Sequence, residues 1–146
     1  MDIFDFRERG NSGVDEERER LATAVIGAAI EVHRTLGPGL LESPYKVCLV
    51  RELITRGLRV ESEVPVPVTY KGLHLDCGFR LDLLVDGDVI VEVKSVAQLL
   101  PVHSAQVITY LKLTDARRAL LFNFNEVTLI AGMRSFLGRG RNVPAE

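Results

Sequence analysis

The chain has 146 residues, of which 47% are apolar, which suits one domain with a hydrophobic core and is too short for two ordinary domains. The formal net charge is −2, and because the first twenty residues hold seven acids and four arginines, the remainder is close to neutral. This balance argues against a protein that holds duplex DNA by basic charge alone. No apolar run could span a bilayer and the N-terminus lacks a secretion signal, so we expect a cytoplasmic protein without membrane contact.

Breaks in the hydrophobic pattern indicate where the domain begins and ends. Residues 1–14 show no sustained period and contain a Gly-Asn-Ser-Gly cluster, so we expect a flexible lead-in there. A single domain is expected over residues 15–137, followed by a flexible tail over 138–146. The segment that begins at Arg134 is expected to be a solvated end.

Two helices are predicted first. Apolar residues at helical spacing, with acids in the first turn, predict a helix over residues 15–36. A second helix is predicted over residues 42–56, because Pro44 falls in its first turn and Gly57 is a suitable C-cap.

Beyond residue 57 the pattern changes to alternation, which is typical of strands. The turns Lys71-Gly72 and Asp86-Gly87 divide this region into three antiparallel strands in a meander. Pro65 and Pro67 interrupt the first of these, which suits an edge or bulged strand. The predicted elements are strands over 58–70, 73–85 and 88–96, a helix over 102–114, and short strands over 119–124 and 127–132.

Three charged residues on two neighbouring strands are the strongest candidates for a site. Asp82 interrupts an apolar strand, and Glu92 and Lys94 are two apart in the next strand, so both point to one face. On its own, Glu-x-Lys is explained as well by a solvent-facing edge with a weak charge pair. Asp82 changes this, because two carboxylates on adjacent strands repel each other unless a cation lies between them.

The chemistry of these groups suits a hard divalent metal. Mg²⁺ prefers oxygen ligands and keeps several waters, and we expect Mn²⁺ to substitute for it. Lys94 beside the carboxylates could position or help deprotonate a metal-bound water, or stabilise charge that develops on a phosphate. The three residues together predict a site for metal-assisted phosphodiester hydrolysis.

The helix predicted over 102–114 adds a polar pair. Gln106 and Tyr110 are four residues apart, so they share one helical face next to the apolar stripe. For this pair alone, a boundary position with polar ends in water is the plain explanation. The coincidence with the strand site favours a role in that site.

A resemblance to a known family supports these assignments. The segments GPGLLESPY, VPVPVTYKG, FRLDLLV, VIVEVKSV and HSAQVITYLK closely resemble the GxxExxY family over about residues 21–132. That family looks like a compact branch of the PD-(D/E)XK nuclease superfamily. The resemblance implies an α/β (α+β), restriction-endonuclease-like core, in which a central mixed sheet with an antiparallel meander is flanked by helices. The site residues that it implies are Glu42, Asp82, Glu92, Lys94, Gln106 and Tyr110.

Glu42 has two compatible roles. A carboxylate in the first turn of a helix gains about 0.3–1 kcal/mol from the helix dipole, which is a sufficient structural explanation. The resemblance makes Glu42 also the third acid of the site, where it binds metal directly or through water, with Tyr45 packed beneath it one turn on.

We therefore expect an Mg²⁺-dependent nuclease that acts on DNA. Asp82 and Glu92 are the expected metal ligands, Lys94 serves the nucleophilic water, and Gln106 and Tyr110 orient Lys94 or the substrate. The expected partner is nucleic acid, and a homodimer or larger complex is left open. The alternative is a catalytically weak or inactive module of the same fold that binds nucleic acid or protein, which the small size and near-neutral charge favour. The intact acids with their lysine argue against it.

A transition-metal site is a weaker alternative. It would use His33, His74, His103 and Cys77, whose spacings fit no compact ligand motif. With Cys48 as the second cysteine, we expect both cysteines to be reduced packing residues.

The nuclease site also requires a particular strand register. If Asp86-Gly87 forms a two-residue turn, Asp82 lies opposite Val91 and points away from Glu92. A three-residue loop, or a bulge of the same parity, places Val85 opposite Val89 and Asp82 opposite Glu92. We predict this second register, because directly opposed residues share a face.

Overall fold

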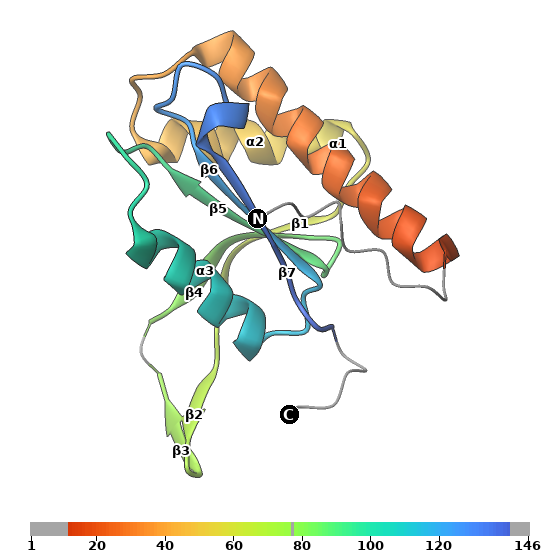
Figure 1. The fold of residues 1–146 in the computed structure, drawn as a ribbon, viewed down its shortest axis with the longest axis vertical. Helices are drawn as coiled ribbons and strands as arrows, with labels where there is room; N and C mark the ends of the chain where they lie inside the picture. The colour runs from red at the N-terminus through yellow and green to blue at the C-terminus, as the bar shows by residue number, and fades with distance from the viewer. Residues whose placement is uncertain (1–11, 77, 141–146) are drawn as a thin grey trace.

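The computed structural model describes residues 12–76 and 78–140 and shows a five-stranded sheet with helices on both faces (Figure 1). A separate two-stranded sheet extends from it. The elements in these ranges are α1 (Ser12–Leu36), α2 (Glu42–Thr55), β1 (Val60–Pro65), β2 (Val68–Tyr70), β3 (Leu73–Leu75), β4 (Arg80–Val85), β5 (Val89–Lys94), α3 (Pro101–Leu113), β6 (Arg118–Asn123), the 3₁₀ helix η1 (Ile130–Gly132) and β7 (Met133–Leu137).

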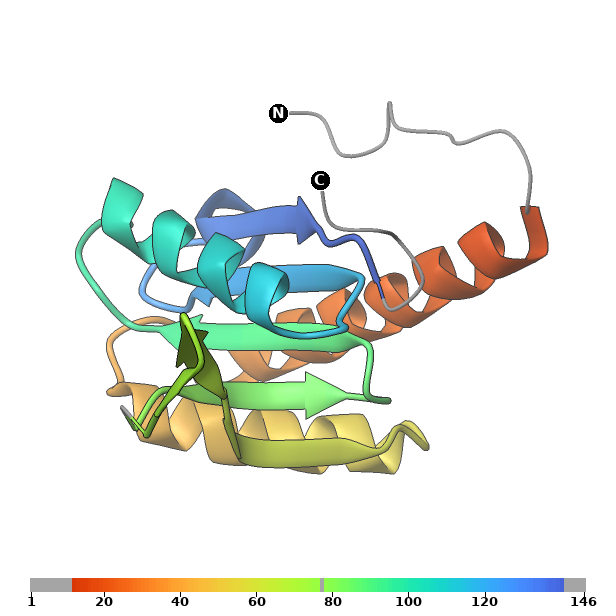
Figure 2. The same cartoon turned by 90° about the horizontal axis from the view of Figure 1, so that it is seen from below.

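The strands of the large sheet lie in the order β1-β4-β5-β6-β7. Neighbouring strands are antiparallel except β5 and β6, which are parallel. A parallel pair needs a crossover connection, and α3 supplies it. Figure 2 shows the resulting layers: α3 covers one face of the sheet, and α1 and α2 cover the other. This mixed sheet with the antiparallel meander β1-β4-β5 confirms the predicted fold class.

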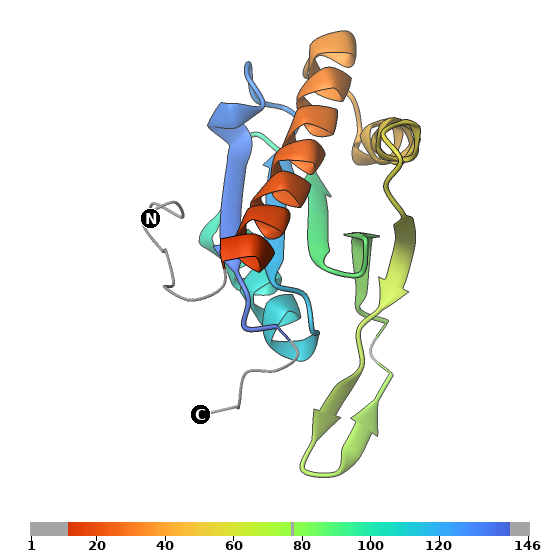
Figure 3. The same ribbon diagram turned by 90° about the vertical axis from the view of Figure 1, so that its right-hand side faces the viewer.

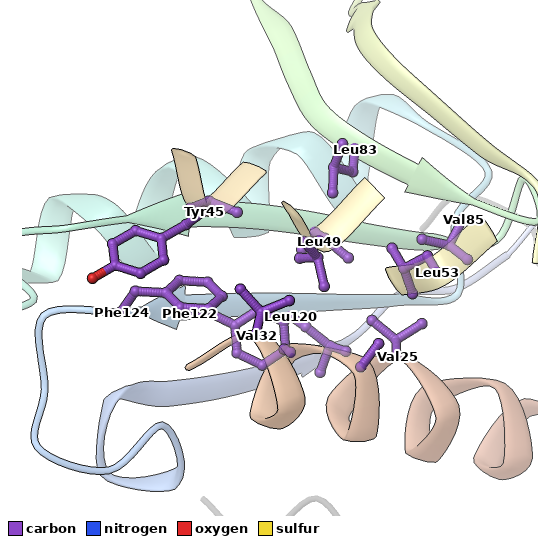
Figure 4. Close-up of a cluster of buried hydrophobic side chains, with 14 of the residues drawn as sticks. Val25, Val32, Tyr45, Leu49, Leu53, Leu83, Val85, Leu120, Phe122 and Phe124 are labelled. Atoms are coloured by element: carbon purple, nitrogen blue, oxygen red, sulfur yellow. The ribbon is translucent and has the colours of Figure 1, made fainter. Parts of the chain in front are cut away.

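The larger hydrophobic core lies between the sheet and the helices α1 and α2 (Figure 4). Alternate residues of β4, such as Leu83 and Val85, point into it and are fully buried. The ring of Tyr45 on α2 stacks on Phe124 with ring centroids 4.6 Å apart. Each large apolar side chain buried here stabilises the fold by about 1.5–3 kcal/mol, so α2 is held firmly against the sheet.

A second core lies under α3. Val107, Tyr110 and Leu111 of this helix are buried against Ile90 of β5 and Leu121 of β6. Because side chains alternate along a strand, residue 92 points to the same face as Ile90. The helix that carries Gln106 and Tyr110 therefore covers the face on which Glu92 lies.

The first two predicted strands of the meander are each divided. β1 ends at Pro65 and β4 begins at Arg80, and the residues between them include the β2–β3 hairpin, which projects beyond the large sheet (Figure 3). The chain leaves the sheet around Pro65 and Pro67, which have no N–H to donate to a strand ladder. Between them, the Val66 N–H donates to the carbonyl of Phe79 at 2.9 Å. As predicted, β1 is an edge strand.

Two predictions near the C-terminus are wrong. Residues 127–132 are not a strand but a turn and the helix η1, and the segment expected to be a solvated end is strand β7, antiparallel to β6. Gly132 shows the physical reason, because a Cβ there would lie only 2.4 Å from the carbonyl oxygen of Asn123. Residues 127–132 therefore form a tight turn that brings the chain back to β6, and the residues of β7 that follow pair with β6.

The ends of the domain differ slightly from the prediction. α1 begins at Ser12 rather than at residue 15, and the remainder of the predicted lead-in, residues 1–11, lies outside the described residues. Of the predicted tail, residues 141–146 lie outside them too, while the Gly138 N–H donates to the carbonyl of Arg117 at 2.8 Å. No described helix is long and apolar enough to cross a membrane.

The loop between β4 and β5 decides which of their residues face each other. Asp86 and Gly87 have φ values of 51° and 65°, as in a type I′ turn, and the Asp88 N–H donates to the carbonyl of Val85 at 3.0 Å. The sheet partner of Val85 is nevertheless Val89, so Asp88 is an extra, bulged residue. The predicted register of Val85 opposite Val89 is confirmed.

Asp88 is held in this bulge by Arg117, the residue before β6. Its Oδ1 accepts the backbone N–H of Arg117 at 3.2 Å, and both carboxylate oxygens accept the side-chain Nε–H at 2.9 Å. The contact ties the turn to the strand that lies parallel to β5.

Asp88→Ala should lower the free energy of unfolding by about 1–3 kcal/mol, because it removes the charge-assisted hydrogen bonds that Arg117 donates to the carboxylate. Urea denaturation followed by circular dichroism measures the change. The control is Glu16→Ala on α1, where the pair with Arg20 is 4.0 Å long and both side chains are 71% exposed. That variant should change stability by less than about 0.5 kcal/mol. Equal effects of the two substitutions would contradict the anchoring role.

Candidate active site

Beyond the regular pairing of β4 and β5, the carboxylates of Asp82 and Glu92 make the hydrogen bonds between the two strands in place of backbone carbonyls. The paired residues reach Leu83 opposite Val91, and Asp82 and Glu92 come next on their strands. The Asp82 N–H donates to Glu92 Oε1 at 3.0 Å, and the Val93 N–H donates to Asp82 Oδ2 at 2.8 Å. Each carboxylate thus binds the backbone of the opposite strand, and the two predicted acids are brought together.

Glu92 is a buried acid with a strongly perturbed pKa. Only 4% of the residue is exposed. Burial, and next the negative charge of Asp82, raise the pKa of Glu92 from 4.5 to about 8. At neutral pH and without a bound cation, Glu92 is therefore protonated in most molecules. A cation near both groups would reverse this, because it favours the ionised form of each carboxylate.

Lys94 lies at the end of β5, where the buried run of the strand reaches solvent. Its positive charge lowers the pKa of Glu92, although less than burial and Asp82 raise it. Among the described residues, its ammonium group has no hydrogen bond or ion pair. Lys94 therefore carries a charge that is near the carboxylates but not committed to a partner.

Gln106 and Tyr110 approach the same carboxylates from α3. Burial raises the pKa of the Tyr110 hydroxyl, and the charges of Glu92 and Asp82 raise it further, while a hydrogen bond with Gln106 lowers it. Tyr110 therefore lies within electrostatic range of both acids. The two side chains are joined to each other, as expected for residues one helical turn apart.

Glu42 is the first residue of α2 and is half-buried. The hydroxyl of Tyr45 donates to the carbonyl of Gly37 at 2.5 Å and accepts the Leu40 N–H at 3.1 Å, which fixes the loop before Glu42. Within residues 12–76 and 78–140, however, no three His, Cys, Asp or Glu side chains are grouped so that they could hold a metal ion. The structure therefore groups Asp82 with Glu92 but not with Glu42, whose role as a ligand stays a prediction.

The structure adds two residues that sequence reasoning missed. Lys46 on α2 donates to Asp82 Oδ1 at 3.2 Å and also to the carboxylate of Glu63 on β1. A signal for Lys46 was available, because it follows Glu42 by four residues and so lies on the same helical face. No comparable signal pointed to Glu63, which reaches the site only because β1 pairs with β4.

The described histidines have separate partners. His33 Nε2 contacts the carbonyl oxygen of Glu126 at 2.8 Å, and His74 Nδ1 contacts Thr69 Oγ1 at 3.2 Å. His103 Nδ1 accepts the Leu100 N–H at 2.9 Å at the start of α3. Cys77, the remaining member of the transition-metal alternative, lies outside the described residues. Nothing in the described part of the chain supports that alternative.

The buried acid predicts that the stability of the metal-free protein depends on pH. The native state binds the proton of Glu92 more tightly than the unfolded chain, so the free energy of unfolding should fall as pH rises from about 5 to about 8. The loss should be on the order of a few kcal/mol. Glu92→Gln should remove this loss, which urea denaturation in EDTA at several pH values measures. Glu61→Gln, on the exposed side of β1, should keep the wild-type slope; the same slope in Glu92→Gln would refute the assignment.

Comparison with known proteins agrees with this geometry. The family model of the PD-(D/E)XK nuclease superfamily matches residues 19–136, which includes α2, the whole sheet except its last residue, and α3. No curated protein and no solved structure matches the chain. The match covers far more than half of the sequence and spans every element that contributes to the paired carboxylates and their neighbours. The chain therefore belongs to the PD-(D/E)XK nuclease superfamily.

Proposed function

We propose that this protein is an Mg²⁺-dependent nuclease that hydrolyses phosphodiester bonds in DNA. The observation that carries the proposal is the pair Asp82 and Glu92, held side by side on neighbouring strands with the positive charge of Lys94 close enough to act on Glu92. Within the superfamily we assign the chain to the GxxExxY family. The motif has a physical role here, because its Tyr45 fixes the loop that precedes its Glu42.

The donor set suits a hard divalent cation. Asp82 and Glu92 offer carboxylate oxygens, and Glu42 could contribute through a water molecule, since Mg²⁺ keeps several waters in its shell. The raised pKa of Glu92 supports this, because two neighbouring carboxylates without a cation favour keeping a proton. When bound, the metal would supply positive charge for the phosphate and activate water for attack.

The other side chains have roles that follow from their positions. Its ammonium group is not engaged by the described residues, so Lys94 can orient the attacking water or stabilise negative charge on the phosphate, and in its neutral amine form it can take a proton from that water. Tyr110 and Gln106 lie over the acids from α3 and can hold Lys94 or the substrate in place. These are positioning roles, because the two side chains would act through Lys94 or the substrate, and the hydrogen bond between them fixes their orientation.

The β2–β3 hairpin supports nucleic acid as the substrate. Tyr70 is exposed, and the ammonium group of Lys71 lies 5.3 Å from the centroid of its ring. An exposed ring next to a positive charge suits the stacking of a base and the binding of a phosphate. The hairpin projects from the end of the sheet at which β4 begins, and β4 carries Asp82, so a nucleic-acid strand that extended from the hairpin along β4 would reach the carboxylates (Figure 3). Local contacts of this kind can compensate for the near-neutral charge of the domain.

Isothermal calorimetry with Mn²⁺ tests the metal site. The wild-type protein should bind the ion at pH 7 and release about one proton from Glu92, which appears as an enthalpy that depends on the buffer. The double variant Asp82→Ala, Glu92→Ala should lose binding. The matched control, Glu16→Ala with Glu17→Ala, removes two acids from exposed positions on α1 and should bind as the wild type does. Wild-type affinity in the Asp82, Glu92 double variant would remove the site.

The role of Lys94 is tested by cleavage. Labelled single- and double-stranded DNA and RNA are incubated with Mg²⁺, Mn²⁺ or EDTA, and DNA should be cut only when the metal is present. Lys94→Ala should reduce the rate by at least about a hundredfold, whereas folding and Mn²⁺ affinity should stay near wild type, because lysine is not a ligand. Lys112→Ala, at an exposed position of α3, is the control.

The alternative of an inactive binding module makes a different forecast for the same assay. Wild-type protein that binds Mn²⁺ but cuts none of the four substrates would support that alternative. Cleavage at the wild-type rate by Lys94→Ala would contradict the catalytic role of the Glu-x-Lys motif.

A further inference from the structure

A cation of the protein itself already occupies one of the two proposed metal ligands. Lys46 Nζ donates to Asp82 Oδ1 at 3.2 Å, while the Val93 N–H donates to Oδ2 at 2.8 Å. Both oxygens of the Asp82 carboxylate therefore have partners in the metal-free protein. The Lys46 side chain is only 22% exposed, so this contact is largely shielded from solvent.

Lys46 has a second carboxylate within reach, that of Glu63 on the edge strand β1. The backbone on either side of Glu63 pairs regularly with β4, with Ser62 opposite Leu83 and Val64 opposite Leu81. Glu63 thus lies at the register position of Asp82. Its side chain is 54% exposed, against 19% for Asp82, so Lys46 lies between an inner and an outer carboxylate.

The backbone of Glu63 is unusual. Its φ of 55° is in the left-handed region that residues other than glycine rarely adopt, although it lies within a strand. Such conformations persist where the surrounding structure favours them, and they are enriched at functional sites. Here the conformation coincides with the contact between the outer carboxylate and Lys46.

We propose that Lys46 is the resident counter-ion of Asp82 in the metal-free protein, and that it releases Asp82 and keeps only its contact with Glu63 when a divalent cation binds Asp82 and Glu92. This inference rests on the proposed metal site and describes its regulation. A divalent ion at Asp82 Oδ1 would repel the ammonium group. The flexible stem of lysine allows it to leave one partner and keep the other. Lys46 thus competes with the metal, and Glu63 determines how easily it yields.

The two residues should change metal affinity in opposite directions. Lys46→Met removes the competing charge, so Mn²⁺ should bind about tenfold more tightly in calorimetry. Glu63→Gln removes the outer partner and leaves Lys46 on Asp82, so binding should weaken by about threefold or more. In the Lys46→Met background, Glu63→Gln should have a much smaller effect, because no ammonium group remains to be held.

A second measurement does not depend on the affinity. In EDTA, Lys46→Met should melt at a lower temperature than the wild type, because Asp82 has lost its counter-ion, and saturating Mn²⁺ should reduce the difference. Lys112→Met and Glu61→Gln, which change the same charges at exposed positions, should match the wild type in both measurements. If Lys46→Met does not fold, Lys46→Gln replaces it in both the wild-type and the Glu63→Gln backgrounds, because its amide is polar but carries no positive charge.

The results separate this inference from the proposed function. Failure of the wild-type protein to bind Mn²⁺ would overturn the metal site, and the displacement of Lys46 with it. Wild-type binding with unchanged affinity in Lys46→Met or in Glu63→Gln would overturn the displacement alone. The same holds if Glu63→Gln weakens binding equally with and without Lys46, because Glu63 would then act only as a nearby negative charge.

Discussion

The candidate site depends on the register of β4 and β5, and this register depends on one bulged residue, Asp88. If Asp88 joined the strand as the partner of Val85, Asp82 would lie opposite Val91 and point away from Glu92. Asp88 instead binds Arg117, the residue before β6, and stays outside the ladder. A contact about 13 Å along the strand from the acids thus decides whether they can meet. The turn and the site therefore depend on the same strand register.

Much of the fold follows from patterns that the sequence makes plain. The alternation along β4 and the β-branched residues of β5 indicate two neighbouring strands, and α2 begins and ends close to its predicted limits. Short apolar runs were less informative. Residues 127–132 and Met133–Leu137 have similar lengths, and only the close approach of Gly132 to Asn123 decides which of them is the strand. That contact joins residues that are separated in the chain by the whole connecting turn, so the sequence around either residue shows no pattern that predicts it.

The site was predictable to the extent that it depends on parity. The alternation of side chains along a strand, together with the requirement that a nuclease site hold both acids on one face, predicted that Asp82 and Glu92 meet, against the simplest turn. Lys46 and Glu63 were not predicted, because their meeting requires the edge strand β1 to bring an exposed acid beside α2. The grouping of Glu42 with the other acids is a matter of side-chain position at a helix start, which periodicity does not determine.

The position of Glu92 on β5 explains how this residue can be held rigidly and also have a raised pKa. β5 is the central strand of the sheet, and its residues from Val89 to Val93 are buried between the two cores. An acid on an exposed edge strand would be hydrated, so burial would not favour its protonated form. Glu92 instead lies in the buried part of β5, two residues before Lys94, where the strand reaches solvent. The packed interior therefore holds the carboxyl group of Glu92 in a fixed position and raises its pKa. Lys94, the next residue on the same face of β5, places a positive charge where a substrate can approach it.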